Sequence, residues 1–186
     1  EAILRSFTDP RIRYFSEPNH GKPYALNHAF SYSNGILIAF LDDDDQWLPG
    51  KLALQVSFLN DNPEVDLIFG NYRNVDKATN QEKDGFAQSA AGLASLQTAS
   101  ASFNFKQITG GWLENLAMDN FIAMDTVVLR KDLMEKTGKF NENLCCAEDF
   151  EFWWRAGLAG YRFAYTDEIL LIRNKYPGSL STSSVR

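Results

Sequence analysis

The chain has 186 residues, of which 45% are hydrophobic and 13% aromatic, so it can bury a core and is not of the disordered class. Its net charge of −6 argues against a nucleic-acid backbone as a partner. An anionic small ligand is not excluded, because a bound metal ion can reverse the charge of a site locally.

The first part of the chain predicts short elements separated by turns. Residues 1–7 are typical of the end of a helix, which Asp9-Pro10 would break. Residues 11–15 alternate polar and apolar side chains, as a short strand does. Residues 24–33 then predict a helix that stops at an Asn-Gly pair.

The next stretch carries the feature around which the rest of the chain is arranged. Residues 36–41 are a continuous apolar run that predicts a short buried strand, and four consecutive carboxylates, Asp42 to Asp45, follow it. A helix with one apolar face is predicted by Leu48, Leu52, Val56 and Leu59, with Pro49 near its first turn. Residues 65–69 predict another strand.

The second half predicts less regular structure. Residues 76–106 are rich in Ala, Ser, Gln and Lys, and we expect an insertion of loops with at most a short helix. Beyond a short helical segment at Trp112, the predicted elements are a strand over 125–129, a helix over 131–137, a helix that starts at Glu148-Asp149 and is closed by Gly160, and strands over 161–165 and 168–172. The tail from Pro177 is rich in serine, and we expect it to be mobile.

Strands that alternate with helices predict an α/β layered sheet in one domain covering residues 1–186. Ligands of such sheets bind beyond the carboxyl ends of the strands, which is where Asp42 to Asp45 should lie.

The aspartate cluster suggests a cation. If residues 42–44 are extended, Asp42 and Asp44 point to the same side and can share one hard ion. Mg²⁺ or Mn²⁺ usually takes one or two carboxylates, while water and substrate phosphates fill the remaining positions. Asp43 would point the other way, toward a sugar hydroxyl. The alternative is a solvated acidic turn before a helix, whose positive N-terminus favours aspartate.

Glu148-Asp149 is a second cluster, predicted at the first turn of a helix whose apolar stripe is Phe150, Trp153, Trp154 and Leu158. A carboxylate here can act as a general base that takes the proton from an attacking hydroxyl. Ordinary helix capping is the alternative.

Two further side chains are candidates for ligand contacts. Lys22 follows a glycine in a turn-rich loop and can reach a diphosphate, although an ordinary surface lysine explains it as well. Trp112, next to Gly110-Gly111, is a candidate for stacking on the ring of an acceptor sugar.

Taken in order, four segments resemble the family 2 glycosyltransferases with the GT-A fold. They are Asn19-x-Gly21-Lys22-x-x-Ala25-x-Asn27, the stretch from Gly35 through Asp42-Asp43-Asp44-Asp45 to Leu52, the stretch from Leu129 through Glu148-Asp149 to Arg155, and Arg173 with Gly178-Ser179-Leu180-Ser181. Each segment alone is weak, whereas all four in this order form a specific match.

The resemblance implies a layered α/β/α mixed sheet, Rossmann-like, and a nucleotide-diphospho-sugar donor, often a UDP-sugar. The implied donor-binding residues are Lys22, Asn27, Asp42, Asp43 and Asp44, with Mn²⁺ or Mg²⁺ at Asp44 and Asp42. Asp149 would be the base for an inverting displacement, Glu148 its runner-up, and Arg173 part of a closing loop near the substrate.

The resemblance also implies what the chain lacks. The family's first β-α-β segment, which carries the nucleobase site, would precede residue 1, so the domain is expected to be N-terminally truncated. Residues 1–75 would be the remaining nucleotide-sugar half and residues 76–186 the acceptor-side half. Without the Gln-x-x-Arg-Trp segment of processive synthases, a single-addition enzyme fits better.

Two other functions remain open. A sugar-1-phosphate nucleotidyltransferase shares the layered architecture and the metal, but it expects a basic, glycine-rich loop near the N-terminus. The second alternative is a non-catalytic sugar-binding module that remains from a transferase.

The expected setting follows from the cysteines and the hydropathy. Cys145 and Cys146 are adjacent, which argues against a disulfide framework and for a cytoplasmic place. No membrane-spanning run or signal peptide is visible. Peripheral association with the inner face of a membrane stays open, because the expected acceptor is a glycan or lipid-linked saccharide in polysaccharide or glycoconjugate synthesis.

Overall fold

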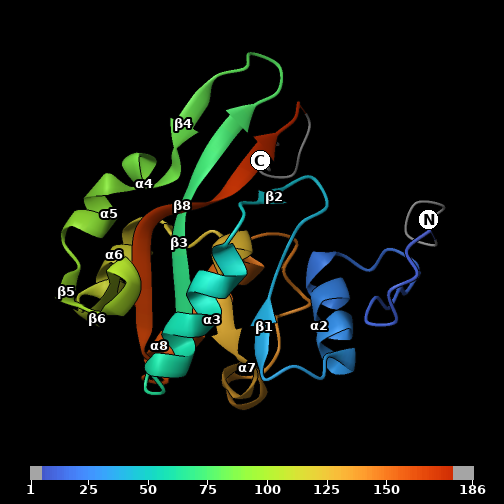
Figure 1. Ribbon diagram of the computed structural model, residues 1–186, viewed down its shortest axis with the longest axis horizontal. Coiled ribbons are helices and arrows are strands. Elements are labelled where there is room, and N and C mark those ends of the chain that lie inside the picture. Colours follow the sequence, from blue (N-terminus) through green and yellow to red (C-terminus); the bar gives the residue numbers. More distant parts are fainter. Residues whose placement is uncertain (1–5, 178–186) are drawn as a thin grey trace.

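A mixed sheet of eight strands runs through residues 6–177, the part of the chain that the computed structural model describes (Figure 1). The strand order is β1-β7-β3-β8-β6-β5, with β2 paired to β8 and β4 paired to β3. The strands are β1 (Leu37–Ala39), β2 (Gln46–Trp47), β3 (Leu67–Asp76), β4 (Glu82–Asp84), β5 (Gln97–Ser100), β6 (Phe105–Gly110), β7 (Val128–Arg130) and β8 (Phe163–Lys175).

Helices cover both faces of this sheet. They are α2 (Lys22–Tyr32), α3 (Lys51–Asp61), α4 (Gly85–Gln88), α5 (Ala90–Ala94), α6 (Trp112–Met118), α7 (Lys131–Thr137) and α8 (Glu148–Leu158), with 3₁₀ turns η1 (Ser102–Asn104) and η2 (Met124–Thr126). No helix within residues 6–177 combines the length and apolar character needed to cross a membrane.

Three strands, β1, β3 and β8, have their carboxyl ends at the same edge of the sheet. β3 and β8 pair in parallel, while β7 is antiparallel to both β1 and β3. The strands β1, β3 and β8 therefore run the same way, and the chain leaves β1 at the carboxyl edge directly into the aspartate cluster. The layered α/β sheet predicted from the sequence is confirmed.

The core is divided by the sheet because side chains alternate along each strand. On β3, Leu67 and Phe69 face the larger cluster, which includes residues of α7 and α8, whereas Ile68 faces the smaller cluster under α3. In Figure 1, α3 crosses the front of the sheet and α8 lies behind it.

Several predicted elements change in the structure. Residues 11–15 do not form a strand, because no described strand lies beside them to complete the hydrogen bonds, and Ile12 is 46% exposed. Residues 36–41 shorten to β1, which is only half-buried because within residues 6–177 it pairs with β7 alone. The two strands predicted over 161–172 are one strand, β8, interrupted by a register shift opposite Gly70 and Asn71.

The region predicted as loops, residues 76–106, contains more regular structure than its composition indicates. It includes β4, α4, α5 and β5, and its end begins β6. The strands β5 and β6 form an antiparallel pair that extends the sheet beyond β8. Such a strand is fixed by pairing with a neighbour, which is why its own residues give a weak signal.

Two helices are present as predicted, but their buried faces differ from the predicted faces. On α3, Lys51, Gln55, Phe58 and Leu59 are buried, while Leu52 is 40% exposed. On α8, Phe152 and Ala156 join Trp153 in the core, while Leu158 is 65% exposed. The predicted tail from Pro177 lies almost wholly outside the described residues.

The contact between α8 and α6 gives a test of the packing. A Cβ at Gly157 would lie 1.6 Å from Cζ2 of Trp112, so Gly157→Ala must displace the indole. Overpacking of this kind costs about 1–3 kcal/mol, and a chain of this size loses about 2–4 °C of melting temperature per kcal/mol. We expect Gly157→Ala to lower the melting temperature in a thermal scan.

The double variant Gly157→Ala/Trp112→Phe is the matched control, because phenylalanine lacks the ring atoms that clash. Its loss of melting temperature relative to the wild type should be smaller than the sum of the losses in the two single variants. A Gly157→Ala protein that melts at or above the wild type would contradict this packing.

Candidate active site

The acidic loop, residues 42–47, leaves β1 at the carboxyl edge of the sheet. The Asp45 N–H donates to the Asp42 carbonyl at 3.2 Å and closes a turn with Asp43 and Asp44 at its exposed tip. The extended geometry expected for residues 42–44 is therefore wrong, and the alternation of side chains does not apply. Shared binding of a cation by Asp42 and Asp44 stays a prediction.

One side of the acidic loop is held by β8. The main chain of Asn174 donates to Asp45 Oδ1 at 3.0 Å, and its side chain donates to the Asp44 carbonyl at 2.5 Å. The short strand β2 pairs with β8 immediately after the turn. These contacts fix the backbone under the tip and leave the carboxylates of Asp43 and Asp44 exposed.

The other side is held by Asp125, a residue that the sequence did not single out. Its Oδ1 accepts the Asp42 N–H at 2.9 Å, and its carbonyl accepts Nε1 of Trp47 at 2.8 Å. Burial, joined by the negative charge of Asp42, raises the pKa of Asp125 to about 7. The one signal in the sequence was a carboxylate at the start of an otherwise apolar predicted strand.

A buried polar row lies behind the loop, on α3. Nζ of Lys51 lies 4.5 Å from the centre of the Trp47 ring and donates to Gln55 at 2.7 Å. Gln55 in turn donates to the Thr126 carbonyl at 2.8 Å. Burial lowers the pKa of Lys51 to about 7, although the charge of Asp125 opposes this.

Lys22 connects the acidic loop with the start of α8. Its ammonium pairs with Oδ2 of Asp42 at 2.5 Å. Burial alone would lower the pKa of Lys22, but the ion pair and the charges of Asp125 and Glu148 outweigh it and raise the pKa. The two carboxylate clusters that the sequence indicated separately therefore lie within electrostatic range of one cation.

The start of α8 carries the second cluster. Glu148 is buried, and Asp149 is half-buried beside it. Burial raises the pKa of Asp149, and the charge of Glu148 raises it further, while the Phe150 N–H that donates to Oδ1 at 2.7 Å only partly offsets this. A carboxylate with a raised pKa at a half-exposed position suits a general base.

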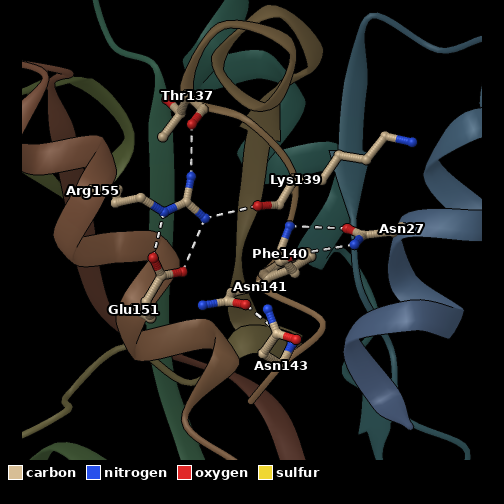
Figure 2. A network of polar contacts seen from close by, with 8 residues as sticks. All are labelled: Asn27, Thr137, Lys139, Phe140, Asn141, Asn143, Glu151 and Arg155. Carbon is tan, nitrogen blue, oxygen red and sulfur yellow. Dashed lines mark hydrogen bonds and ion pairs between the residues drawn. The ribbon is translucent and has the colours of Figure 1, made fainter. Parts of the chain in front are cut away.

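The segment that leads into α8 is tied in place by polar contacts (Figure 2). Arg155 donates to the carbonyls of Thr137 at 2.6 Å and Lys139 at 2.8 Å, and it pairs with Glu151 on its own helix. These bonds connect α8 to the end of α7 and so fix where the Glu148-Asp149 turn begins.

Asn27 makes a second tie, from α2. Its carboxamide accepts the Phe140 N–H and donates to the Phe140 carbonyl, both at 2.9 Å (Figure 2). It also donates to Glu142 at 2.8 Å. Because the side chain is buried and its groups are used within the chain, this geometry does not favour the predicted contact with a donor, which stays a prediction.

The remaining predicted residues lie apart from this centre or at its margin. Trp112 packs on Phe163, with ring centres 4.4 Å apart, and against Gly157, so stacking on an acceptor stays a prediction. Arg173 lies on β8 with its guanidinium 6.0 Å from the Tyr72 ring and within electrostatic range of Asp45. Residues 178–181, its predicted companions, lie outside the described residues.

An apolar hollow opens beside the start of α8. It has a volume of about 290 Å³ and is lined by Ala117, Phe150, Glu151 and Trp154. The rings of Phe150 and Trp154 stack at 25° with their centres 6.1 Å apart.

The carboxylates suit only some metal ions. Among residues 6–177, no three His, Cys, Asp or Glu side chains are grouped so that they could hold an ion by themselves. Mg²⁺ and Mn²⁺ need only one or two carboxylates when substrate phosphates and water complete the shell. The exposed carboxylates of Asp43 and Asp44, with Asp42 beside them, fit an ion bound in this way.

Comparison with known proteins identifies a family and several relatives. A family model described as glycosyl transferase family 2 matches residues 1–122. An uncharacterized glycosyltransferase of Methanocaldococcus jannaschii is 25% identical over 174 residues, which is 92% of this chain and 54% of the relative. The Escherichia coli protein WfgD, named a UDP-Glc:alpha-D-GlcNAc-diphosphoundecaprenol beta-1,3-glucosyltransferase, is 38% identical over 71 residues, 38% of this chain and 28% of that protein.

The fold is similar to that of a solved structure. Staphylococcus aureus TarS 1-349 in complex with UDP-GlcNAc matches with a TM-score of 0.62 and 19% identity over 90% of this chain and 42% of that one. Its complex with UDP matches with a TM-score of 0.59 and 20% identity, over 87% and 43% of the two chains. The chain thus spans about half the length, or less, of the proteins that it matches.

The buried lysine gives a test of the polar row. The pKa of Lys51 in the folded chain is about 7, below the value of about 10.4 for a free lysine. Burial of this lysine therefore does not reduce the stability of the fold above about pH 10.4, and it reduces that stability increasingly as the pH falls toward 7. Lys51→Met removes this titration. Its melting temperature relative to wild type should be higher at pH 7 than at pH 10.5, by about 2 °C or more.

Lys136→Met is the matched control, because Lys136 is an exposed lysine paired with Asp132. Its melting temperature should follow the wild type within about 1 °C at both pH values. If Lys51→Met differs from wild type by the same amount at both, the buried lysine does not titrate as described.

Proposed function

This chain belongs to glycosyl transferase family 2, and from that premise we propose that it transfers a sugar from a nucleotide-diphospho-sugar to a hydroxyl acceptor, with inversion at the anomeric carbon. The observation that carries the proposal is the position of Lys22. Its ammonium lies within electrostatic range of both the acidic loop and Glu148-Asp149, so donor-side and acceptor-side carboxylates share one centre.

A UDP-sugar is the first choice of donor. TarS structures are described in complex with UDP and UDP-GlcNAc, and the name of the E. coli relative includes UDP-Glc. Lys22 would contact the diphosphate after leaving its pair with Asp42, and Arg173 would add positive charge at the edge of the loop.

The residues that would hold Mn²⁺ or Mg²⁺ are Asp44 and Asp42, with Asp43 next to a sugar hydroxyl. When bound, such an ion supplies Lewis-acid stabilisation of a leaving diphosphate. The contribution of the chain itself is to present these carboxylates on a turn whose backbone is held from both sides.

Asp149 would accept the proton of the acceptor hydroxyl. As it does so, the hydroxyl oxygen would bond to the anomeric carbon of the donor, and the bond from that carbon to the diphosphate would break. Glu148 is the runner-up, but it is only 8% exposed and less accessible to an acceptor. Asn120 donates weakly to Asp149 at 3.4 Å and helps to orient the carboxylate.

The acceptor would approach from the α8 side. The stacked rings of Phe150 and Trp154 follow Asp149 directly, and aromatic faces of this kind suit the apolar face of a sugar ring. We propose a glycan or lipid-linked saccharide as the acceptor, which would place the protein in the cytoplasm or at the inner face of a membrane. Residues 1–75 would then serve the donor and residues 76–186 the acceptor.

The general base is tested by Asp149→Asn, which keeps the shape of the side chain but cannot accept the proton. Loss of general-base catalysis lowers the rate by about 10²–10⁴-fold. Transfer or hydrolysis would be measured with a panel of UDP-sugars and Mn²⁺. The exposed control Asp132→Asn should retain wild-type rates. Activity that survives Asp149→Asn, or that needs no divalent ion, contradicts the mechanism.

The pH profile tests the pairing of the two carboxylates. Because the pKa of Asp149 is raised, activity should fall as pH drops through a value above the usual range for aspartate. Glu148→Gln removes the like charge, so the acid limb of kcat/KM should move to lower pH. A limb that stays in place or moves to higher pH would show that Glu148 does not set this pKa.

A further inference from the structure

We propose that Asp125 is a positioning residue for the reaction: it holds both ends of the acidic loop and so fixes where the loop presents its carboxylates to the donor. The inference rests on the proposed function. No predicted motif includes this residue, and it lies far along the chain from the loop that it holds.

Asp125 reaches the loop with two different groups. Its side chain accepts the N–H of Asp42, the first residue of the loop, and its main-chain carbonyl accepts the indole N–H of Trp47, the last residue. A single buried residue therefore sets the distance between the two ends of the turn. Such a constraint acts on the whole segment, because the turn between the ends is closed by its own hydrogen bond.

The anchor itself is immobilised. Asp125 lies in the 3₁₀ turn η2, directly before β7, and is 4% exposed. The next residue, Thr126, donates its hydroxyl to the Ala123 carbonyl at 2.7 Å, and its own carbonyl accepts from Gln55. Through Asp125, the acidic loop is therefore attached to the residues that lead into β7 and to α3, and not to another surface loop.

The chemistry of the contact is unusual. Asp125 is a buried carboxylate that interacts with Asp42 and Asp45, and the positive charges that act on it belong to Lys22 and Lys51. Like charges in such a setting oppose folding. The position therefore demands an acceptor with the reach of an aspartate side chain, a demand that asparagine also meets without the charge.

Because asparagine and aspartate can both accept this hydrogen bond, variants of Asp125 distinguish a positioning role from a merely structural one. Asp125→Asn keeps an oxygen for the Asp42 N–H, whereas Asp125→Ala leaves that N–H without its acceptor. Gly157→Ala is the structural control, because it disturbs the packing of Trp112 against α8 and leaves both contacts of Asp125 with the loop intact. Trp47→Phe releases only the far end of the loop.

The experiment measures hydrogen exchange over residues 40–48 and calorimetric binding of UDP with Mn²⁺, in the full protein. Asp125→Ala should speed exchange in the loop and weaken binding, each by about ten-fold or more, because the N–H of Asp42 loses its hydrogen bond. Asp125→Asn should stay within about two-fold of wild type in both measurements. Gly157→Ala should lower the melting temperature without changing either loop exchange or binding.

Two outcomes overturn the proposal. One is loop exchange that Asp125→Ala leaves unchanged, and the other is an Asp125→Asn protein as impaired as Asp125→Ala. If Asp125→Ala does not fold, Trp47→Phe carries the test, and faster exchange at residues 46–48 is then expected. If wild type binds no nucleotide with Mn²⁺, the proposed function fails, while hydrogen exchange still decides the role of Asp125.

Discussion

The ammonium group of Lys22 is the interaction on which the arrangement of the site depends. Asp42, Asp125 and the adjacent pair Glu148-Asp149 come from three separate parts of the chain, and like charges brought together repel. Lys22 offsets part of that repulsion, and burial together with the repulsion that remains raises the pKa values of Asp125 and Asp149. A centre that gathers this much negative charge on one edge of a sheet favours a ligand that brings a cation, in agreement with the proposed metal-assisted transfer.

The site is held in place by buried and half-buried polar groups around it, whereas binary patterning assumes an apolar interior. Asn27 pairs with the backbone of Phe140 as a neighbouring strand would, and Arg155 binds the carbonyls at the end of α7 (Figure 2). Behind the acidic loop, Lys51 donates to Gln55, and Gln55 donates to the carbonyl of Thr126. Each of these bonds is directional, so each fixes an angle as well as a contact, and the carboxylates are thereby placed on a rigid frame.

Much of the fold could be predicted from local patterns, and the failures have common physical causes. The helices α2, α3, α7 and α8 and the strand after residue 65 follow from period and stop signals. The buried face of α3 could not be predicted, because Lys51 is buried only when a tryptophan ring and a glutamine lie opposite it. The strands β5 and β6 were missed since their partners, and not their composition, make them strands.

By itself, the sequence determined the family, the layered α/β class and the residues with unusual chemistry, because runs of carboxylates and their order along the chain are local properties. Only the tertiary structure decided how these residues meet: that Asp43 and Asp44 form the tip of a turn, that Lys22 lies between two clusters, and that Asp125 holds the loop. The reason is physical. These relations join residues far apart in the chain, and their hydrogen bonds and charge interactions exist only once the sheet has brought the segments together.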